Sequence, residues 1–275
     1  PIYTNLSTFD PINDFSVSVN LNGPIIPGFL TFYSSGRLNG SDGWLFGKQT
    51  FTMYGDTVFF DQNNNGFMDN GETVKEPNYS SMNWYSSWST QNKVTLKLTP
   101  TTKLRINSIF NSGISQGYDH YRQMAQDGRK KNYNTGDFIG LNISHSFSPR
   151  SFMDINISQY SHKYESYLFE DPLDSRYSTP DSLFWAHISG EIPIHIQQEY
   201  GGNVNYFPQY TFNRWGVDTD RFKRETLTKS LKIDYTNQFN KYNQLKVGGD
   251  LAYHTLSLDS YGLLDSSQAD QKFSP

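Results

Sequence analysis

The sequence predicts an all-β fold, a partial antiparallel transmembrane β-barrel that contributes about eight strands to a larger barrel. Three observations lead to this prediction. Long segments alternate apolar and polar residues with a period of two, as expected of strands whose two faces meet different surroundings. The connections between these segments alternate between a few residues and tens of residues. Finally, 16% of the residues are aromatic and only 35% are hydrophobic, which fits a barrel with a polar interior and aromatic rims.

The clearest pair of strands lies at 226–258, where two long arms flank the short polar segment NKYN. Odd-numbered positions in both arms are mostly apolar, and the even-numbered positions of the first arm are polar. Each arm is longer than the usual strand of about five or six residues. A tilted strand that crosses a membrane needs about 9–11 residues. We therefore expect lipid to meet the odd-numbered face, which includes Leu231, Ile233, Val247 and Leu251.

The same alternation predicts six further strands, which gives four hairpins in total. These strands cover residues 14–22, 29–37, 83–98, 102–110, 139–147 and 153–158. The long connections are expected to be external loops at approximately 38–83, 112–136 and 168–223. Short periplasmic turns combined with long external loops are typical of outer-membrane barrels. Residues 1–275 are accordingly interpreted as a single partial barrel domain.

The polar positions of these strands are expected to face the wet interior of the barrel and to pair with one another. They include Lys93, Lys97, Arg105, Asp154, Lys232 and Asp234. In the last strand the alternation shifts after Tyr253, so that Leu256 and Leu258 fall on the formerly polar face. We interpret this shift as the point where the strand leaves the bilayer and enters an external loop.

Several functional classes are disfavoured by what the sequence lacks. It contains no cysteine, which removes disulfides and thiolate chemistry. Its net charge is −4 without any basic block, so nucleic acid is not an expected partner. No run approaches 18 apolar residues, and no transmembrane helix is predicted. Neither a nucleophile elbow nor an HExxH motif is present, and we predict that the chain is not an enzyme.

Residues 61–72 match the spacing of an EF-hand calcium loop. Oxygen-bearing side chains fall at alternating loop positions, Gly66 occupies the position of the sharp turn, and a glutamate closes the loop. A bound Ca²⁺ would stiffen the first long loop. The alternative is an Asn/Gly-rich loop that matches by chance, because the preceding segment is typical of a strand rather than a helix. The predicted ligands are Asp61, Asn63, Asn65, Phe67 through its carbonyl oxygen, Asp69 and Glu72.

Charged and aromatic residues near the predicted loops each have two possible roles. The basic cluster at 129–131 and the mixed charge run at 218–225 either face solvent or contact anionic lipopolysaccharide. Aromatic residues toward the loop ends of strands are typical of the membrane interface, with ligand stacking as the alternative. These residues are Trp84, Tyr85, Trp88, Tyr160, Tyr164 and Tyr167.

Four segments resemble successive hairpins of TonB-dependent outer-membrane receptors of the Bacteroidota type, and the similarity covers most of residues 10–260. The resemblance implies a barrel of about 22 strands around a plug, in the outer membrane of a Gram-negative bacterium. It also implies energised uptake of an unknown ligand, with TonB acting through the plug, and contacts with outer-membrane lipid and lipopolysaccharide. The segments are NLNGPIIPGFLTFYSSGR, STQNKVTLKLTPTTKLRI, ISHSFSPRSFMDINISQYSHKYESYLFEDP and WGVDTDRFKRETLTKSLKIDYTNQFNKYNQLKVGGDLAYHTLSL.

The sequence contains neither a plug domain nor a TonB-contacting segment. It begins PIYTNL and ends DQKFSP, and we expect it to be a piece of a longer chain whose transport function belongs to the whole protein. Two alternatives stay open. A small, complete eight-stranded barrel would act as an adhesin or structural protein. A soluble, calcium-dependent β-sandwich would bind glycans and would bury the odd-numbered face of residues 226–258 against a second sheet.

Overall fold

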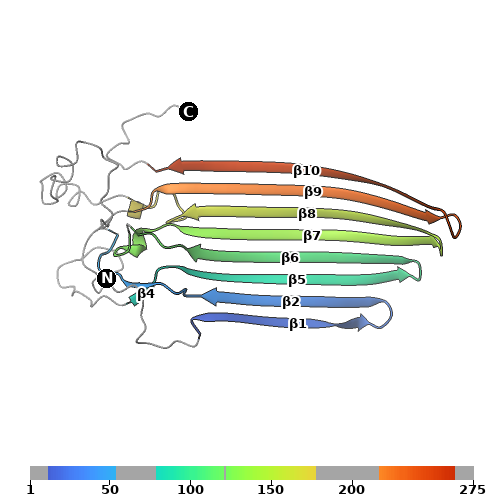
Figure 1. Ribbon diagram of the computed structural model, residues 1–275, viewed down its shortest axis with the longest axis horizontal. Coiled ribbons are helices and arrows are strands. Elements are labelled where there is room, and N and C mark those ends of the chain that lie inside the picture. Colours follow the sequence, from blue (N-terminus) through green and yellow to red (C-terminus); the bar gives the residue numbers. More distant parts are fainter. Residues whose placement is uncertain (1–11, 54–78, 121, 178–216, 264–275) are drawn as a thin grey trace, which may run out of the picture.

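A computed structural model describes residues 12–53, 79–120, 122–177 and 217–263, and eight of their ten strands form one antiparallel sheet (Figure 1). The sheet order is β1-β2-β5-β6-β7-β8-β9-β10. The predicted all-β, antiparallel fold is therefore confirmed. Two short strands, β3 and β4, pair separately with each other. The bounds are β1 Asp14–Ile26, β2 Leu30–Ser41, β3 Phe46–Lys48, β4 Tyr79–Ser81, β5 Trp84–Thr99, β6 Thr102–Gln116, β7 Lys131–Ser148, β8 Ser151–Tyr167, β9 Asp220–Gln238 and β10 Gln244–Gly262.

The four hairpins β1–β2, β5–β6, β7–β8 and β9–β10 all turn at one end of the sheet, and the long connections leave from the other end (Figure 1). We call these the turn end and the loop end. The β1–β2 connection shows why so few residues suffice for a turn. Gly28 has a φ of +79°, and the Phe29 N–H donates to the Ile26 carbonyl oxygen at 3.0 Å. With Pro27 second and a left-handed glycine third, these residues form a type II turn.

Several strands extend further toward the loop end than the sequence predicts. The strand β6 continues to Gln116 and β7 begins at Lys131, so their connection covers 117–130 rather than 112–136. Likewise, β2 continues to Ser41, and β9 already begins at Asp220. Four of the six predicted loop boundaries were therefore wrong, because pairing with a neighbouring strand keeps residues of weak strand propensity in the sheet. The boundaries at 83 and 168 are confirmed, since β5 begins at Trp84 and β8 ends at Tyr167.

The last strand also corrects the interpretation of the shift after Tyr253. Pairing of β10 with β9 continues without a bulge past Leu256, opposite Thr226, and Leu258, opposite Arg224. The strand therefore does not end near Tyr253. Since side chains alternate along a strand, Leu256 and Leu258 project from the polar side of the sheet, where they are 72% and 64% exposed.

The pairing register brings the apolar positions of the strands to a common face. Two adjacent register rows of this apolar face carry almost only large apolar side chains, and the opposite, polar face carries mainly Ser, Thr, Asn and charged residues. One register row across the apolar face consists of Phe32, Val94, Ile106, Leu141, Ile157, Leu231 and Leu251. The adjacent row nearer the turn end contains Leu30, Leu96, Leu104, Ile143, Ile155 and Ile233.

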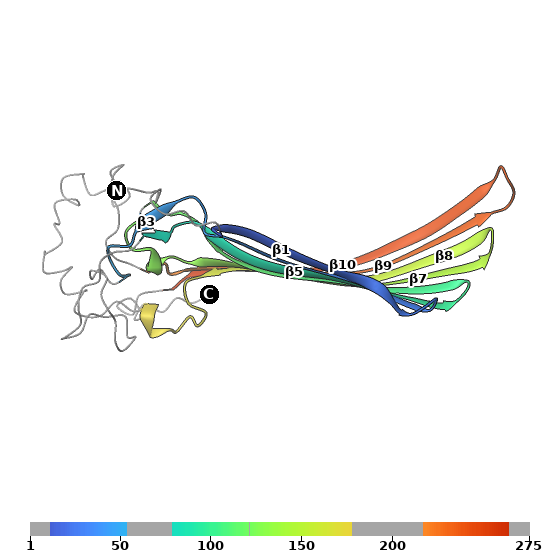
Figure 2. The ribbon, with the colours of Figure 1, turned by 90° about the horizontal axis from the view of Figure 1, so that it is seen from below.

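The eight strands form a single twisted layer (Figure 2). Among the described residues, β1 pairs only with β2 and β10 only with β9, so both edges of the sheet are open. No helix in this part of the chain is long and apolar enough to span a membrane. The buried hydrophobic residues of the same part all lie outside the eight strands, at the loop end, and are Leu45, Met82, Ala125, Leu168 and Tyr177.

Candidate functional site

The apolar face exposes large hydrophobic side chains in the middle of long strands. Leu251 is 72% exposed, Val247 56% and Val19 57%. Soluble monomers rarely leave contiguous apolar patches larger than a few hundred Å² uncovered. A soluble sandwich would bury these positions against a second sheet, and no second sheet covers them among the described residues. This face is therefore the first candidate interaction surface.

On the polar face, a hydrogen-bonded ladder crosses from β6 to β8. Arg105 donates from Nη1 to Asn142 Oδ1 at 2.5 Å and to Ser144 Oγ at 3.1 Å. From β7, Asn142 Nδ2 donates to Asn156 Oδ1 at 2.7 Å, and Ser144 Oγ donates to Asp154 Oδ1 at 2.5 Å. Neutral side chains thus link a guanidinium to a carboxylate two strands away. In a connected network of this kind each polar group keeps hydrogen-bonding partners where water is restricted.

All six residues predicted to face the barrel interior lie on the polar face by register, but the structure joins only some of them. Arg105 and Asp154 are the two charged ends of the ladder. Lys232 and Asp234 form a separate pair along β9, with Nζ 3.6 Å from Oδ2. The neutral members of the ladder on β7 and β8 lie on the polar side, as their alternation predicts, but their role in linking the charged ends was not predicted. Only the pairing register, which the sequence does not give directly, shows that they lie between the charges.

Unpaired positive charge gathers on β5 and β6 of the same face. Lys97 lies opposite Lys103 in the register, and Lys93 lies four residues before Lys97 on the same strand. None of these three lysines makes an ion pair with another described residue. Like charges directly opposite each other on a sheet are destabilising. Apart from Asp14 at the start of β1, the acidic side chains of this face lie on β8 to β10, so positive charge is concentrated on β5 and β6 and charges of both signs lie on β8 to β10.

The loop end contains a small folded core around Met82, whose side chain is only 1% exposed. The end of this side chain packs so closely over Gly47 that a Cβ there would require the methionine to move. Arg129, 6% exposed, donates from Nη1 to the Met82 carbonyl oxygen at 3.3 Å. Gln116 Nε2 in turn donates to the Arg129 carbonyl oxygen at 3.0 Å. These contacts connect the β3–β4 sheet to the 117–130 connection.

The two roles predicted for the basic cluster at 129–131, solvent exposure or contact with lipopolysaccharide, are therefore wrong for Arg129. Its burial results from contacts with residues distant in the sequence. Lys130 lies 3.8 Å from the Asp218 carboxylate and 3.6 Å from that of Asp220. Lys131 is the first residue of β7. The cluster thus connects loop segments to one another.

The mixed charge run at 218–225 also makes contacts within the chain. Arg221 donates to the carbonyl oxygens of Phe169 at 2.5 Å and Glu170 at 2.7 Å. Lys223 pairs with Glu225 at 3.1 Å. The Arg221 bonds hold the start of β9 against the segment that follows β8, whereas the Lys223–Glu225 pair lies within β9.

Two charged groups at the loop end have altered pKa values. The surrounding protein removes water from the Asp127 carboxylate and so raises the pKa of Asp127, although the Met53 N–H donates to this carboxylate at 2.9 Å and opposes the rise. Because Asp127 keeps solvent-exposed surface, we expect the effect on stability to be small. Burial lowers the pKa of Arg129, and the negative charges of Asp119 and Asp218 act in the opposite direction.

The six aromatic residues expected at the membrane interface do not share one face. Register and alternation place three on the apolar face and three on the polar face, where the Tyr164 hydroxyl donates to Asn132 Oδ1 at 3.0 Å. An interfacial aromatic belt lies on the lipid-facing surface, so only the three aromatic residues on the apolar face are placed where such a belt requires them. The apolar face carries Trp84, Trp88 and Tyr167, and the polar face carries Tyr85, Tyr160 and Tyr164.

The predicted calcium loop at 61–72 lies outside the described residues, as does every one of its six predicted ligands. In the part of the chain that the structure describes, no group of three or more His, Cys, Asp or Glu side chains is placed to hold a metal ion. Comparisons of the chain with models of protein families, with curated proteins and with solved structures found no match. The functional proposal therefore depends on the two faces of the sheet and on the sequence resemblance.

Proposed function

We propose that this chain forms part of the wall of an outer-membrane β-barrel, within a TonB-dependent receptor that takes up a ligand from outside the cell. In this arrangement the apolar face meets lipid, the polar face lines the interior, and the loop end lies outside the membrane. The resemblance of four segments to hairpins of that receptor family supports the assignment to a receptor rather than to another kind of barrel.

The observation that carries the proposal is the opposite character of the two faces of a single-layer sheet. On one face, side chains such as Leu251 and Val247 are more than half exposed and need an apolar medium. On the other, Arg105 and Asp154 are joined through a hydrogen-bonded ladder. Strands of outer-membrane barrels alternate apolar residues toward lipid with polar residues toward the lumen in this way.

The open edges favour a larger barrel over a small closed one. A complete eight-stranded barrel would pair β1 with β10, whereas each of these strands has a single partner among the described residues. The edge strand β10 is 19 residues long and leaves one side of its backbone unpaired. Unprotected edges of this length promote aggregation, and barrels remove them by closure. Additional strands on both sides would therefore complete the wall.

Calcium binding by the Asp61–Glu72 loop belongs to the proposal as a structural contribution to the first long connection. Its support is the spacing of the oxygen ligands around Gly66. Adding a calcium chelator should accelerate proteolytic cleavage within residues 54–78, and restoring Ca²⁺ should reverse the effect. A cleavage rate that does not respond to the chelator would remove calcium from the proposal and leave the barrel assignment intact.

Two neighbouring residues on opposite faces test whether the sheet lies in a bilayer. Leu251 and Ala252 are adjacent and exposed on β10. A lysine on the lipid side costs about 2–4 kcal/mol at the midplane and less toward the border of the apolar band, whereas one facing the lumen costs little. We expect Leu251→Lys to reduce insertion into lipid vesicles and Ala252→Lys to leave it near the native level, as measured by heat-modifiable gel migration. Equal effects of the two substitutions, or a chain that stays monomeric without detergent, would reject the membrane assignment.

The receptor assignment needs a separate test, because other barrels also insert into membranes. The coding sequence upstream of Pro1 provides it directly. A TonB-dependent receptor requires a plug domain and a TonB-contacting segment on the same polypeptide. Finding such a domain upstream would support the receptor, and finding none in the complete reading frame would leave a barrel of another function.

A further inference from the structure

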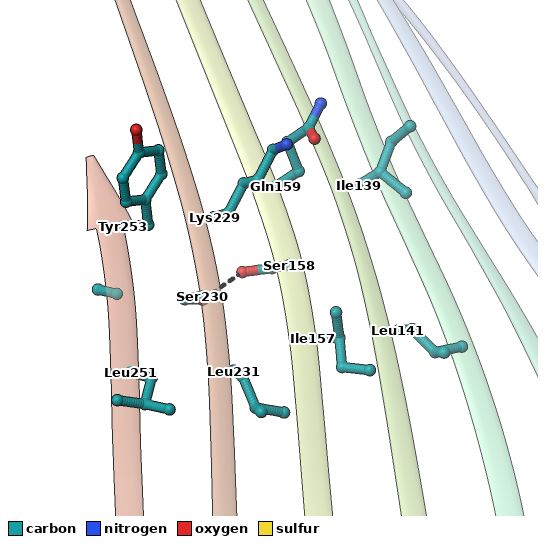
Figure 3. A pocket seen from close by; sticks show the side chains of 11 residues that line it. Ile139, Leu141, Ile157, Ser158, Gln159, Lys229, Ser230, Leu231, Leu251 and Tyr253 are labelled. Atoms are coloured by element: carbon teal, nitrogen blue, oxygen red, sulfur yellow. Dashed lines mark hydrogen bonds between the residues drawn. The ribbon is translucent and has the colours of Figure 1, made fainter. Parts of the chain in front are cut away.

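A pocket of about 720 Å³ lies on the apolar face across β7 to β10. Its two ends differ in chemistry (Figure 3). The end toward the turns is lined by the leucines and isoleucines of one register row, including Leu231 and Leu251. At the other end, the side chains of Lys229, Gln159 and Tyr253 gather, contributing an ammonium, an amide and a phenol group. The pocket is therefore amphipathic along the strand direction.

Lys229 differs from two other lysines on this side of the sheet, which are paired. Toward the loop end of the same strands, Lys163 pairs with Glu165 at 2.9 Å and Lys223 with Glu225 at 3.1 Å. Lys229 makes no ion pair or side-chain hydrogen bond with another described residue, and it interrupts the apolar positions of β9. An ammonium without a counter-ion at the border of an apolar surface is complementary to an anionic group supplied by a ligand.

The position of Lys229 matches the level of lipid head groups. Phe239, in the β9–β10 turn, is exposed and marks the turn end of the apolar positions. The ten residues from Lys229 to Phe239 correspond to about 33 Å along the strand at ~3.3 Å per residue. With a strand tilt of ~40°, this length corresponds to a height of about 25 Å, the typical apolar band of an outer-membrane barrel. Lys229 therefore lies at one border of the band, where lysines reach toward head groups.

We propose that this pocket binds an anionic, phosphate-bearing lipid. The phosphate contacts Lys229, with Gln159 and Tyr253 as hydrogen-bonding neighbours, and an acyl chain lies over Leu231 and Leu251. This inference rests on the proposed function, because the surrounding bilayer supplies the lipid. It goes beyond general lipid contact by assigning one binding position and a preference for net negative charge in the head group.

The test compares retention of two lipids by the full chain in a non-ionic detergent, using native mass spectrometry. Dioleoyl phosphatidylglycerol carries a net negative charge, and dioleoyl phosphatidylcholine, with the same chains, carries none. We expect the native chain to retain more phosphatidylglycerol and Lys229→Met to lower this preference roughly fivefold, the effect of one lysine beside an anionic lipid. Lys246→Met, the same change on the polar face of β10, should leave the preference unchanged.

Two further outcomes separate this proposal from the proposed function. Leu251→Ser should reduce retention of both lipids, because it removes the acyl-chain contact without changing charge. If Lys246→Met lowers the preference as much as Lys229→Met, or if Lys229→Met has no effect, the pocket is not the binding position. Insertion into vesicles should be unchanged in Lys229→Met. If the native chain needs no detergent, the membrane assignment fails, and binding of monomeric dihexanoyl phosphatidylglycerol at Lys229 then tests the pocket independently.

Discussion

The eight-stranded sheet and the loop end of the molecule are stabilised in different ways. Around Met82 the loop end has a protein interior, with buried apolar side chains and a buried arginine whose guanidinium reaches a backbone carbonyl. The sheet is held by strand pairing and polar contacts on one face, and the described residues bury no hydrophobic side chain within it. The difference indicates that the loop end carries its own core, whereas the sheet depends on the medium against its apolar face.

Among the variants that test this difference in stabilisation, Met82→Ala is expected to have the largest effect. Removal of a fully buried methionine side chain typically costs about 2–5 kcal/mol, because it leaves a cavity. We expect faster hydrogen exchange in residues 117–120 and 122–130 and in β3, while β7 and β8 exchange as before. Leu256→Ala, at an exposed site, should change neither region. Loss of protection throughout the sheet in Met82→Ala would show that the two regions form one cooperative unit.

The polar ladder predicts the next largest effect. Asp154→Asn weakens the bond from Ser144 and removes the negative end of the ladder. Since hydrogen bonds to charged groups contribute about 1.5–3 kcal/mol and this site is only partly buried, we expect a loss of roughly 1–2 kcal/mol of unfolding free energy in detergent. Asp250 lies on the same face and makes no side-chain hydrogen bond with a described residue. Asp250→Asn should therefore change the free energy of unfolding by less than about 0.5 kcal/mol. Similar losses in both variants would mean that general charge, and not the ladder, stabilises this face.

Adjacent glycines on β10 offer a smaller but well-controlled comparison of the two faces. A Cβ at Gly248 would lie 2.6 Å from Asp234 Oδ1, whereas a Cβ at Gly249 would meet open space. Valine is favoured in strands. We expect Gly249→Val to be neutral or stabilising, and Gly248→Val to be less stable by about 1 kcal/mol because it displaces Asp234. Guanidinium unfolding in detergent measures both variants, and the reverse order would show that the faces are assigned incorrectly.

The smallest effect concerns pH at the loop end. Because the pKa of Asp127 is raised in the folded protein, its ionisation opposes folding: this unfavourable contribution is absent below the ordinary carboxylate pKa and is complete above the raised value. Protection of residues 122–130 against hydrogen exchange, corrected for intrinsic rates, should thus increase slightly as the pH falls through this window. The dependence should be lost in Asp127→Asn. A protection that decreases on acidification equally in both proteins would assign the pH effect to another group.

Much of the sheet could be predicted from the sequence, because alternation with a period of two is a local property. Leu231, Ile233 and Val247 were placed on the apolar face from spacing alone, and the register confirms that they share it. The ends of β6 and β7 could not be placed in this way. Ser112 and Gly113 resemble loop residues and are held in the strand by pairing with β7.

The contacts of individual side chains were harder to predict from the sequence. Arg129 resembled an exposed basic residue, but its partner at Met82 lies 47 residues earlier in the chain. The ladder from Arg105 to Asp154 required knowledge of which residues of β6 and β7 face each other. In that pair even-numbered residues of one strand oppose odd-numbered residues of the other, and the length of the connection alone does not determine this.

The strict chain order of the eight strands has a consequence for how such a wall can grow. Each hairpin is joined to the next only through the loop end, and no strand is inserted between two strands that precede it in the sheet. A hairpin can therefore be gained or lost at an edge without changing the order of the other strands. The circumference of the wall can thus change in steps of two strands. Duplication of a gene segment that encodes one hairpin is sufficient for such a step.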